Sequence, residues 1–393
     1  ICLEMIPNQF SEHNFKEYDG IKYLINEEKK VARVFRSDSG DAYIPRSIVC
    51  DSQEYIVTSI CPKAFKDFCK VTSVQFSKDS EIKIIESNTF TSNSIKSITL
   101  PSSVTELREG WCQNTPMLHR IKVDPNNQYY KSYQDQFIFS KSSPEQENFN
   151  VLIFSVFNIK TANIPDYIEI FGPQSFSFCL QLSTINLSSN SNLKIIERDV
   201  FNLSSIEKFT IPSSVIEIKE GWCKNAFHLK EVKVDSKNKR YSNYDDNFVI
   251  GKSSIDQENF DVLIFCFCKN EIVKIPDFIE IIAPFSFSHF NQLQQVEFSF
   301  NSKLRTIEKE AFSFTNIKLF KIPNNLVKIG EKAFRECENL IELQIQPKSN
   351  LKIIEKEAFS YTKINQFQIK SDTVELKEGW NQNMLELNNV KIN

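Results

Sequence analysis

The chain has 393 residues, a formal net charge of −3 at pH 7 and an apolar content of 41%, with 34 Phe but only 8 Gly. This near-neutral charge gives no electrostatic reason to expect nucleic acid or an anionic membrane as partner, and no nucleic-acid-binding motif occurs. The longest apolar runs, Val151–Phe157 and Val262–Cys268, are far shorter than the roughly 20 residues that span a bilayer. We therefore expect no membrane span in this chain, although a signal peptide or an anchor could have been lost by truncation before Ile1 or after the last residue.

Aromatic residues return along the chain at alternating intervals of 25 and 21 or 22 residues. These landmarks are Phe65, Phe90, Trp111, Phe176, Phe201, Trp222, Phe287, Phe312, Phe334, Phe359 and Trp380. Two intervals break the rhythm, Trp111 to Phe176 and Trp222 to Phe287, and both are 65 residues long. A fixed period of about 20 to 50 residues is typical of a solenoid, in which each turn contacts only its neighbours. We expect the aromatic landmarks to form an internal ladder in such a stack.

Residues 1–50 are predicted to be an N-terminal capping region, and residues 51–393 are predicted to form the solenoid. The last ten residues, Met384–Asn393, have the pattern of a strand without a polar cap after it. An uncapped end predicts either further turns or a partner there.

Three short turns share one pattern. The segment Ile95–Trp111 returns 111 positions later as Ile206–Trp222, and a third copy begins at Ile317. Each begins with apolar residues that alternate with polar ones, which is the period of a strand with one buried face. A proline follows at once, as at Pro101. Because proline has no backbone N–H, the strand is predicted to end there.

The long turns begin with the same triplet and continue through a polar loop, as in Leu182–Phe201. Similar turns run over Leu293–Phe312 and Leu340–Phe359, and more loosely over Val71–Phe90. One turn cannot bury its apolar side chains alone, whereas turns stacked about 4.8 Å apart bury them against one another. The predicted fold is a repeat solenoid of mainly short parallel β-strands joined by short helical or irregular turns.

Each 65-residue interval holds one turn and an insertion of about 40 residues, at 124–163 and at 235–274. The insertions are copies of each other, since Lys141–Phe149 corresponds to Lys252–Phe260. Two apolar runs separated by a polar turn predict a β-hairpin in each insertion, which projects from the stack or lies along it.

The insertions also carry tyrosines before the hairpin, which the pattern leaves exposed. Insertions in repeat proteins often lie on one face and bind partners, but a hairpin that only packs against the solenoid is an equally physical interpretation. The candidate ligand-binding residues of the insertions are Tyr129, Tyr130, Tyr133, Tyr241 and Tyr244.

Strand residues that alternate with buried ones are predicted to line the concave face of a curved solenoid. This row is polar and mixed in charge, and it has few of the aromatic anchors that dominate binding hot spots. The row therefore suits weak adhesion or a polar ligand such as a glycan. Its candidate ligand-binding residues are Arg120, Lys122, Lys208, Glu231, Lys233, Glu297 and Lys321.

Leu340 follows Phe334 and Cys337 at fixed spacing, and Ala-Phe pairs end at the landmarks Phe65, Phe312, Phe334 and Phe359. The repeat consensus that these residues carry resembles the leucine-rich repeat of the BspA-like surface-antigen family. The resemblance covers about residues 44–393 and implies a leucine-rich-repeat solenoid. Members of that family occur on mucosal bacteria and flagellate parasites, where they are associated with adhesion. The resemblance implies no particular set of binding residues.

No catalytic, metal or cofactor site is predicted. The segment Gly251–Ser253 resembles the end of a phosphate-binding loop, but Asp246 stands where such a loop needs a glycine. The four histidines form no H-x-x-x-H pair. Of the ten cysteines, only Cys112 and Cys223 correspond between the copies, so most are interpreted as small core residues and not as a disulfide framework.

The first interpretation is a non-enzymatic adhesion protein, at the cell surface or outside the cell, that binds a protein or glycan of a host, a matrix or another microbe. The alternative is an intracellular, cytoplasmic scaffold that assembles partner proteins. A signal peptide or an anchor in the full reading frame would favour the first interpretation.

Overall fold

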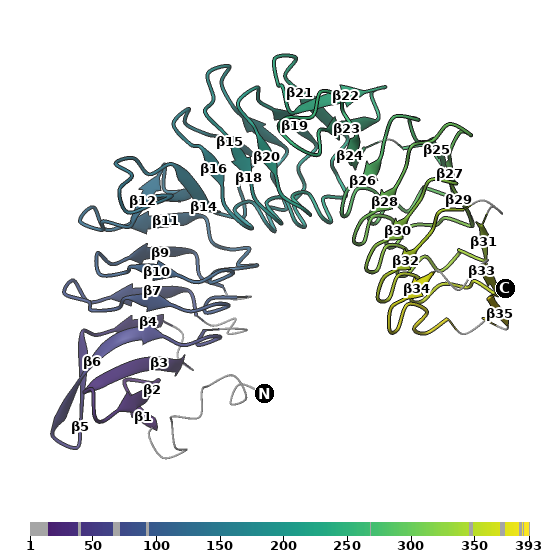
Figure 1. Ribbon diagram of the computed structural model, residues 1–393. Coiled ribbons are helices and arrows are strands. Elements are labelled where there is room, and N and C mark those ends of the chain that lie inside the picture. The colour runs from purple at the N-terminus through teal and green to yellow at the C-terminus, as the bar shows by residue number, and fades with distance from the viewer. Residues whose placement is uncertain are drawn as a thin grey trace. The chain divides into compact units, whose positions relative to one another are not determined.

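The structure is a computed structural model that describes residues 15–37, 41–65, 71–91, 94–267, 269–345, 349–369, 374–384, 387 and 389–392. These residues form β-strands, turns and irregular segments, and none of them is helical (Figure 1). The chain divides into two compact units, one of Ile1–Leu193 with Asp199–Ile206 and one of Lys194–Arg198 with Glu207–Asn393. Each unit is a β-solenoid, as predicted, and the described turns between the strands are irregular.

The first unit begins with a sheet that leads directly into the solenoid. Its strands are β1 (Phe15–Tyr18), β2 (Ile21–Asn26), β3 (Val31–Ser37), β5 (Ser47–Cys50) and β6 (Gln53–Ile60). The first three run antiparallel in chain order, and β6 pairs antiparallel with β5 but parallel with β3. Because β6 also pairs with the solenoid strand β8 (Ile84–Ile85), no sheet boundary separates the two parts. The predicted capping region ends within the β5–β6 pair and stays a prediction as a separate domain; its first 14 residues lie outside the described ones.

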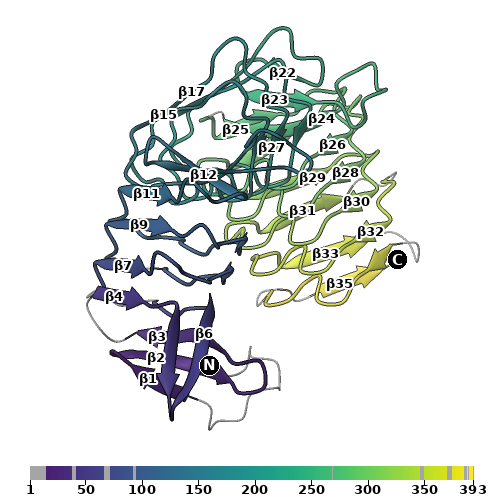
Figure 2. The same ribbon diagram turned by 90° about the vertical axis from the view of Figure 1, so that its left-hand side faces the viewer.

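Most turns of the solenoid carry one strand of three or four residues and one of two. The longer strands stack in parallel as β4 (Asp41–Ile44), β7 (Ser73–Phe76), β9 (Ser97–Leu100) and β11 (Arg120–Val123) (Figure 2). The two-residue strands β8 and β10 (Glu106–Leu107) pair beside them. As predicted, β9 ends directly before Pro101. The two-residue strands were not predicted, because two residues are too few to show a period.

The insertions are larger than the predicted hairpins. In the first insertion the predicted strands β13 (Phe137–Ser140) and β14 (Val151–Ser155) do pair antiparallel, but β12 (Tyr130–Tyr133) adds a third antiparallel strand. Strand β14 then pairs in parallel with the solenoid strand β16 (Ile170–Phe171). The insertion is therefore built into the sheet of two-residue strands, whereas the prediction had it projecting from the stack or lying along it. After it, the longer strands resume with β15 (Thr161–Asn163) and β17 (Thr184–Asn186).

The second unit repeats this plan. Its insertion strands β22 (Tyr241–Tyr244), β23 (Phe248–Gly251) and β24 (Val262–Cys266) are antiparallel, and β24 pairs in parallel with β26 (Ile281–Ile282). The two-residue strands continue as β28 (Thr306–Ile307), β30 (Lys328–Ile329), β32 (Ile353–Ile354) and β34 (Glu375–Leu376). The longer strands are β25 (Ile272–Lys274), β27 (Gln295–Glu297), β29 (Leu319–Ile322) and β31 (Glu342–Ile345), followed by the pair β33 (Gln366–Ile369) and β35 (Asn389–Ile392). Before the insertion, β18 (Ile195–Ile196) pairs with β20 (Glu217–Ile218), and β19 (Lys208–Ile211) pairs with β21 (Glu231–Val234).

A buried asparagine at the start of each insertion forms hydrogen bonds with the turn before it. Asn127 Nδ2 donates to the carbonyl oxygens of Pro101 and Val104 at 3.1 and 2.9 Å, and its Oδ1 accepts from the backbone N–H of Tyr129 and Tyr130, both at 2.8 Å. Such a side chain uses its full hydrogen-bonding capacity while it is buried. It therefore fixes where the insertion begins.

Asn238 makes the same four hydrogen bonds in the second unit. Its Nδ2 donates to the Pro212 and Val215 carbonyl oxygens at 2.7 and 3.0 Å. Its Oδ1 accepts from the backbone N–H of Arg240 and Tyr241, both at 2.8 Å. This contact is a constant part of the insertion and was not predicted.

The aromatic landmarks form the predicted internal ladder. All eleven are buried, and in the second unit the Phe287, Phe312, Phe334 and Phe359 rings follow one another at 4.8, 5.2 and 5.2 Å, with planes within 16° of parallel. These separations are close to the spacing of paired strands. Backbone hydrogen bonds join the same positions of neighbouring turns, since Phe312 N–H donates to the Ala333 carbonyl at 2.8 Å. Because burying a Phe side chain stabilises a fold by about 1.5–3 kcal/mol, the ladder is a main source of cohesion between turns.

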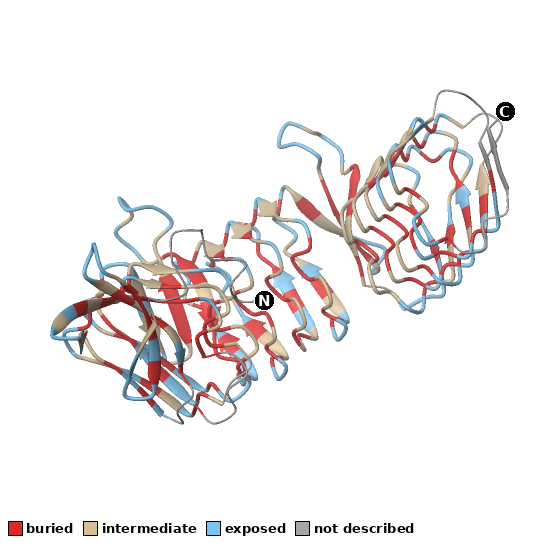
Figure 3. Ribbon diagram, turned by 90° about the horizontal axis from the view of Figure 1, so that it is seen from below, coloured by how far each residue is buried: buried red, intermediate tan, exposed pale blue. Residues whose placement is uncertain are grey.

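The remaining strand residues separate into a buried and an exposed set. Figure 3 shows buried and exposed segments alternating along the strands. In β9, Ile98 and Leu100 are buried and Ser97 and Thr99 are exposed, as the period of two predicts.

The cysteines agree with the prediction of small core residues. The seven that lie among the described residues are free, and six of them are buried, with Cys50 half-buried. Cys2, Cys69 and Cys268 lie outside the described residues.

Candidate binding surfaces

The predicted row of charged residues lies on the longer strands, on the side opposite the core. Its members belong to β11, β19, β21, β27 and β29. In β11, for example, Arg120 and Lys122 are exposed on either side of the buried Ile121. Glu231 is half-buried and the other six members of the row are exposed. The alternation is therefore confirmed, and the concave shape of the face stays a prediction.

Most charged residues of the row form ion pairs with neighbours. Arg120 Nε and Lys122 Nζ lie 3.7 and 3.5 Å from Asp135 Oδ2, a carboxylate of the first insertion. In the second unit, Glu231 pairs with Lys233 at 2.8 Å and with Lys208 at 3.0 Å. Hydrogen bonds from these two lysines lower the pKa of the Glu231 carboxyl, which keeps the group ionised. Exposed pairs of this kind stabilise a fold by at most about 1 kcal/mol, but they reduce the net charge available to a partner.

Glu297 and Lys321 differ from the rest of the row. They lie on the adjacent strands β27 and β29, each two residues beyond the paired Gln295 and Leu319. Within the part of the chain that the structure describes, neither makes an ion pair. Together with Phe300 they line a pocket of about 380 Å³.

Phe300 is the most exposed of the large apolar side chains of the described residues, with 91% of its surface accessible. It lies in the loop after β27, which was predicted only as polar. The signal that would have revealed it is the comparison between copies, because the residue 111 positions earlier is Ser189. Packing of the core does not require an aromatic side chain at this position, since the other copy has a serine there.

The candidate tyrosines of the insertions do not share one environment. Tyr129 and Tyr244 are exposed at 52% and 38%, Tyr130 and Tyr133 are half-buried, and Tyr241 is buried at 4%. The expected exposure is therefore correct for Tyr129 and Tyr244 and wrong for Tyr241. A ligand-binding role for these tyrosines stays a prediction. It suits mainly Tyr129 and Tyr244, whose exposed side chains a ligand can contact.

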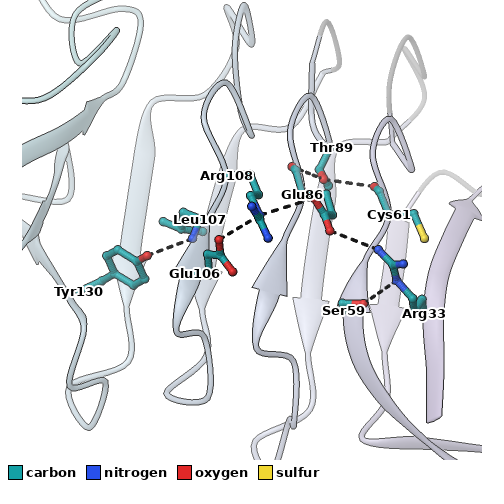
Figure 4. A network of polar contacts seen from close by, with 9 residues as sticks. All are labelled: Arg33, Ser59, Cys61, Glu86, Thr89, Glu106, Leu107, Arg108 and Tyr130. Atoms are coloured by element: carbon teal, nitrogen blue, oxygen red, sulfur yellow. Dashed lines mark hydrogen bonds and ion pairs between the residues drawn. The ribbon is translucent and has the colours of Figure 1, made fainter. Parts of the chain in front are cut away.

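Tyr130 and Tyr241 instead terminate the sheets of two-residue strands. The Leu107 N–H of β10 donates to the Tyr130 hydroxyl at 3.0 Å (Figure 4). That hydroxyl donates to the Thr105 carbonyl at 3.3 Å. The Ile218 N–H donates in the same way to the Tyr241 hydroxyl at 2.9 Å. A strand edge with unpaired N–H groups tends to add further strands. The tyrosine hydroxyl satisfies that edge where the insertion begins.

A chain of charges crosses the same sheet of the first unit. Arg33 lies 3.3 Å from Glu86, and Arg108 lies 3.8 Å from Glu86 and 2.9 Å from Glu106 (Figure 4). Each arginine therefore faces a carboxylate of a neighbouring turn. This chain of charges extends from Arg33 on β3 to Arg108, which lies in the turn that ends at Trp111.

The comparison with known families agrees with the repeat architecture. The pattern described as BspA type leucine rich repeat region matches in six copies, over residues 47–156, 125–245 and 258–388. The chain belongs to this BspA-type leucine-rich-repeat family. A search of curated proteins found no match.

Solved structures similar to this BspA-type chain come from bacteria. A leucine-rich repeat protein of Eubacterium ventriosum has 17% identity and a TM-score of 0.52, covering 96% of this chain and 84% of the other. The pneumococcal vaccine antigen PcpA has 18% identity and a TM-score of 0.48, with coverages of 96% and 86%. A leucine rich cell surface protein of Faecalibacterium prausnitzii has 17% identity and a TM-score of 0.46, with coverages of 96% and 94%. The first of these likenesses supports the solenoid fold.

The BspA-type turns bury six of the seven described thiols. Burial raises the pKa of both Cys112 and Cys179 to about 12 and that of Cys61 and Cys337 to about 11. These thiols are protonated near neutral pH and are poor nucleophiles. The described residues contain no group of three His, Cys, Asp or Glu side chains placed to hold a metal ion. They also include no helix long and apolar enough to cross a membrane.

Proposed function

We propose that this BspA-type repeat protein is a non-enzymatic binding protein that acts at the cell surface or outside the cell and adheres to macromolecules of a host, a matrix or another microbe. Membership of the family supports a binding role, since solenoids offer extended surfaces and few enclosed cavities. The resemblance of the repeat to the BspA-like surface-antigen family supports the surface location.

The observation that carries the proposal is the exposed Phe300 beside Glu297 and Lys321. Aromatic residues supply most hot spots of protein interfaces, and they do so best where a polar rim surrounds them. Here one ring and two charges without ion-pair partners in the described chain meet in one shallow pocket. This combination favours a protein partner that has an apolar side chain for the ring and opposite charges for the rim.

The substitution Phe300→Ser tests this surface, because serine is the residue that the preceding copy has at Ser189. We expect binding of the purified chain to host cells or to immobilised matrix proteins to weaken about ten-fold or more. The melting temperature should not change, since the ring is already exposed. Ile255→Ser is the matched control, because Ile255 is another highly exposed apolar side chain, on the second insertion. Unchanged binding by Phe300→Ser would remove this surface from consideration.

Location is tested separately by labelling intact cells of the source organism with a reagent that does not cross membranes. Labelling before lysis is expected. Labelling only after lysis would contradict the proposal and favour the intracellular scaffold.

A further inference from the structure

We infer that a cleft beside the first insertion is a second binding site, which takes a neutral, hydroxyl-rich ligand such as a short oligosaccharide. The cleft has a volume of about 690 Å³ and lies entirely within the first unit. Its walls are residues 105 and 107–113 around Trp111, the insertion residues 128–130, 140–144, 153–155 and 157, and residues 173, 174 and 177 of the next turn. Such a volume is within the usual range of small-ligand sites.

The cleft exists because the insertion interrupts the regular stacking of turns. Among the described residues, no further strand pairs with the open side of β10, and Tyr130 satisfies its edge with a hydroxyl group. A single side chain fills less space than a strand and its turn. The gap is bridged deep in the core by Trp111 and Phe154, whose ring centroids are 5.4 Å apart, and it stays open above them.

Each charged group of the cleft contacts a neighbouring side chain, which favours a neutral ligand over an ion. Arg108 faces Glu106 and Glu86. Glu109 Oε1 accepts a hydrogen bond from Gln174 Nε2 at 2.7 Å. Lys141 Nζ lies 5.3 Å from the ring centroid of Phe149, so an aromatic face attracts it. A neutral ligand can enter without separating these charges.

Amide oxygens converge in the cleft at Gly110. A methyl group built on the Gly110 α-carbon would lie 3.5 Å from Gln113 Oε1 and 3.8 Å from Gln174 Oε1, and both glutamines line the cleft. Gln174 Oε1 is buried and has no hydrogen-bond partner among the described residues. A buried acceptor without a donor is costly, and a ligand O–H that reaches it removes that cost. Two amide oxygens in one place match a ligand that carries several hydroxyl groups.

Tyr129 supplies the apolar part of the site. It lines the cleft and is half-exposed, so the ring offers a flat face to a ligand. Aromatic side chains combine a large apolar area with one polar tip, which suits a sugar ring whose faces are apolar and whose rim is hydroxylated. Gln128 and the serines of the insertion loop add further neutral polar groups.

The second insertion lacks this arrangement although it is built on the same plan. Lys224 and Phe285 occupy the positions of Gln113 and Gln174, and Arg240 that of Tyr129. Lys224 Nζ lies 4.4 Å from the Phe285 ring centroid and 3.5 Å from Glu310 Oε2. These side chains contact one another, so the second copy has neither the amide oxygens nor the exposed ring. The first cleft is the one expected to bind.

The test presents the purified full chain to an array of neutral, sialylated and sulfated oligosaccharides and to unrelated peptides. We expect binding to neutral oligosaccharides, and at least a ten-fold loss in the double variant Gln113→Lys/Gln174→Phe. This variant carries the side chains that the second copy already accommodates, so its fold should persist. Tyr129→Ala changes an exposed ring and should also weaken binding at least ten-fold. The control Ile255→Ser changes an exposed side chain that does not line the cleft and should bind the array like the natural chain.

Three outcomes would overturn the inference: no neutral oligosaccharide is bound, charged glycans or peptides are preferred, or the double variant binds as well as the natural chain. The inference is independent of the protein surface proposed above. Phe300→Ser should leave array binding intact even where it reduces binding to cells or matrix. Loss of array binding in Phe300→Ser would assign the glycan to the other surface and also overturn the inference.

Discussion

The two insertions are anchored in the same way and differ where a ligand would lie. In both, a buried asparagine makes four hydrogen bonds to the backbone, and a tyrosine hydroxyl satisfies the last two-residue strand. The side chains beside Trp111, in contrast, are amides, whereas those beside Trp222 include a lysine packed on a phenylalanine ring. The anchoring contacts are thus what the fold requires, and the side chains of the cleft are the part that can vary. Three experiments separate these two roles.

The largest effect is expected for the asparagines. Asn127→Ala and Asn238→Ala each remove four hydrogen bonds and leave two backbone N–H groups without their acceptor, so we expect each to lower the free energy of unfolding by about 3 kcal/mol. Urea unfolding followed by circular dichroism measures the loss, and hydrogen exchange of the two insertions locates it. Asn126→Ala is the control, since Asn126 is exposed, and a change within about 0.5 kcal/mol is expected. Clearly unequal losses for Asn127 and Asn238 would contradict a common anchor.

A smaller effect is expected for the tyrosine hydroxyls, and here the two copies should differ. Tyr130 borders the open cleft, so in Tyr130→Phe water can reach the Leu107 N–H, and we expect a loss of about 0.5–1 kcal/mol. Tyr241 is buried, and Tyr241→Phe should leave the Ile218 N–H without a partner at a cost of about 1–3 kcal/mol. Thermal unfolding compares the variants, and amide exchange at Leu107 and Ile218 reports the two edges. A larger loss for Tyr130→Phe would mean that the first cleft does not admit water.

The repeated part of the chain was predictable because repetition reports contacts between equivalent residues of neighbouring turns. Phe312 and Phe334 stack because they hold the same position in consecutive turns, and the strand before Pro101 ends where its donor is lost. The insertion contacts have no such regularity. Asn127 reaches back 26 residues to Pro101, and no period along the chain shows that distance.

The candidate sites were predictable in part for the same reason. Alternation placed Glu297 and Lys321 outside correctly, because strand geometry alone decides which side a residue faces. It could not show that Asp135 neutralises Arg120 and Lys122, since that pairing depends on how the insertion folds back. Nor could composition distinguish Tyr129, which lines the cleft, from Tyr241, which is buried.

The smallest effect concerns pH and again contrasts the two copies. His289 stacks on Phe314 with ring centroids 4.3 Å apart, and the ring of Phe227 meets its edge at 5.6 Å. Burial lowers the pKa of the His289 imidazole; the nearby Lys224 lowers it further, and Glu310 opposes this in part. The corresponding residue of the first copy is Phe178, which cannot titrate.

Because the folded chain disfavours the protonated His289, the unfolded chain binds a proton first as the pH falls. The stability that neutral His289 provides is therefore complete above about pH 6.5, the ordinary value, and decreases as the pH falls through the lowered pKa. We expect amide exchange around residues 285–293 to accelerate between about pH 7 and pH 5.5, after correction for the intrinsic exchange rate, while residues 174–182 of the first copy show no such change. His289→Phe introduces the residue of the first copy and should abolish the difference. If the acceleration persists in His289→Phe, another group causes it. His289 and Phe178 would then differ in shape but not in their effect on the pH dependence.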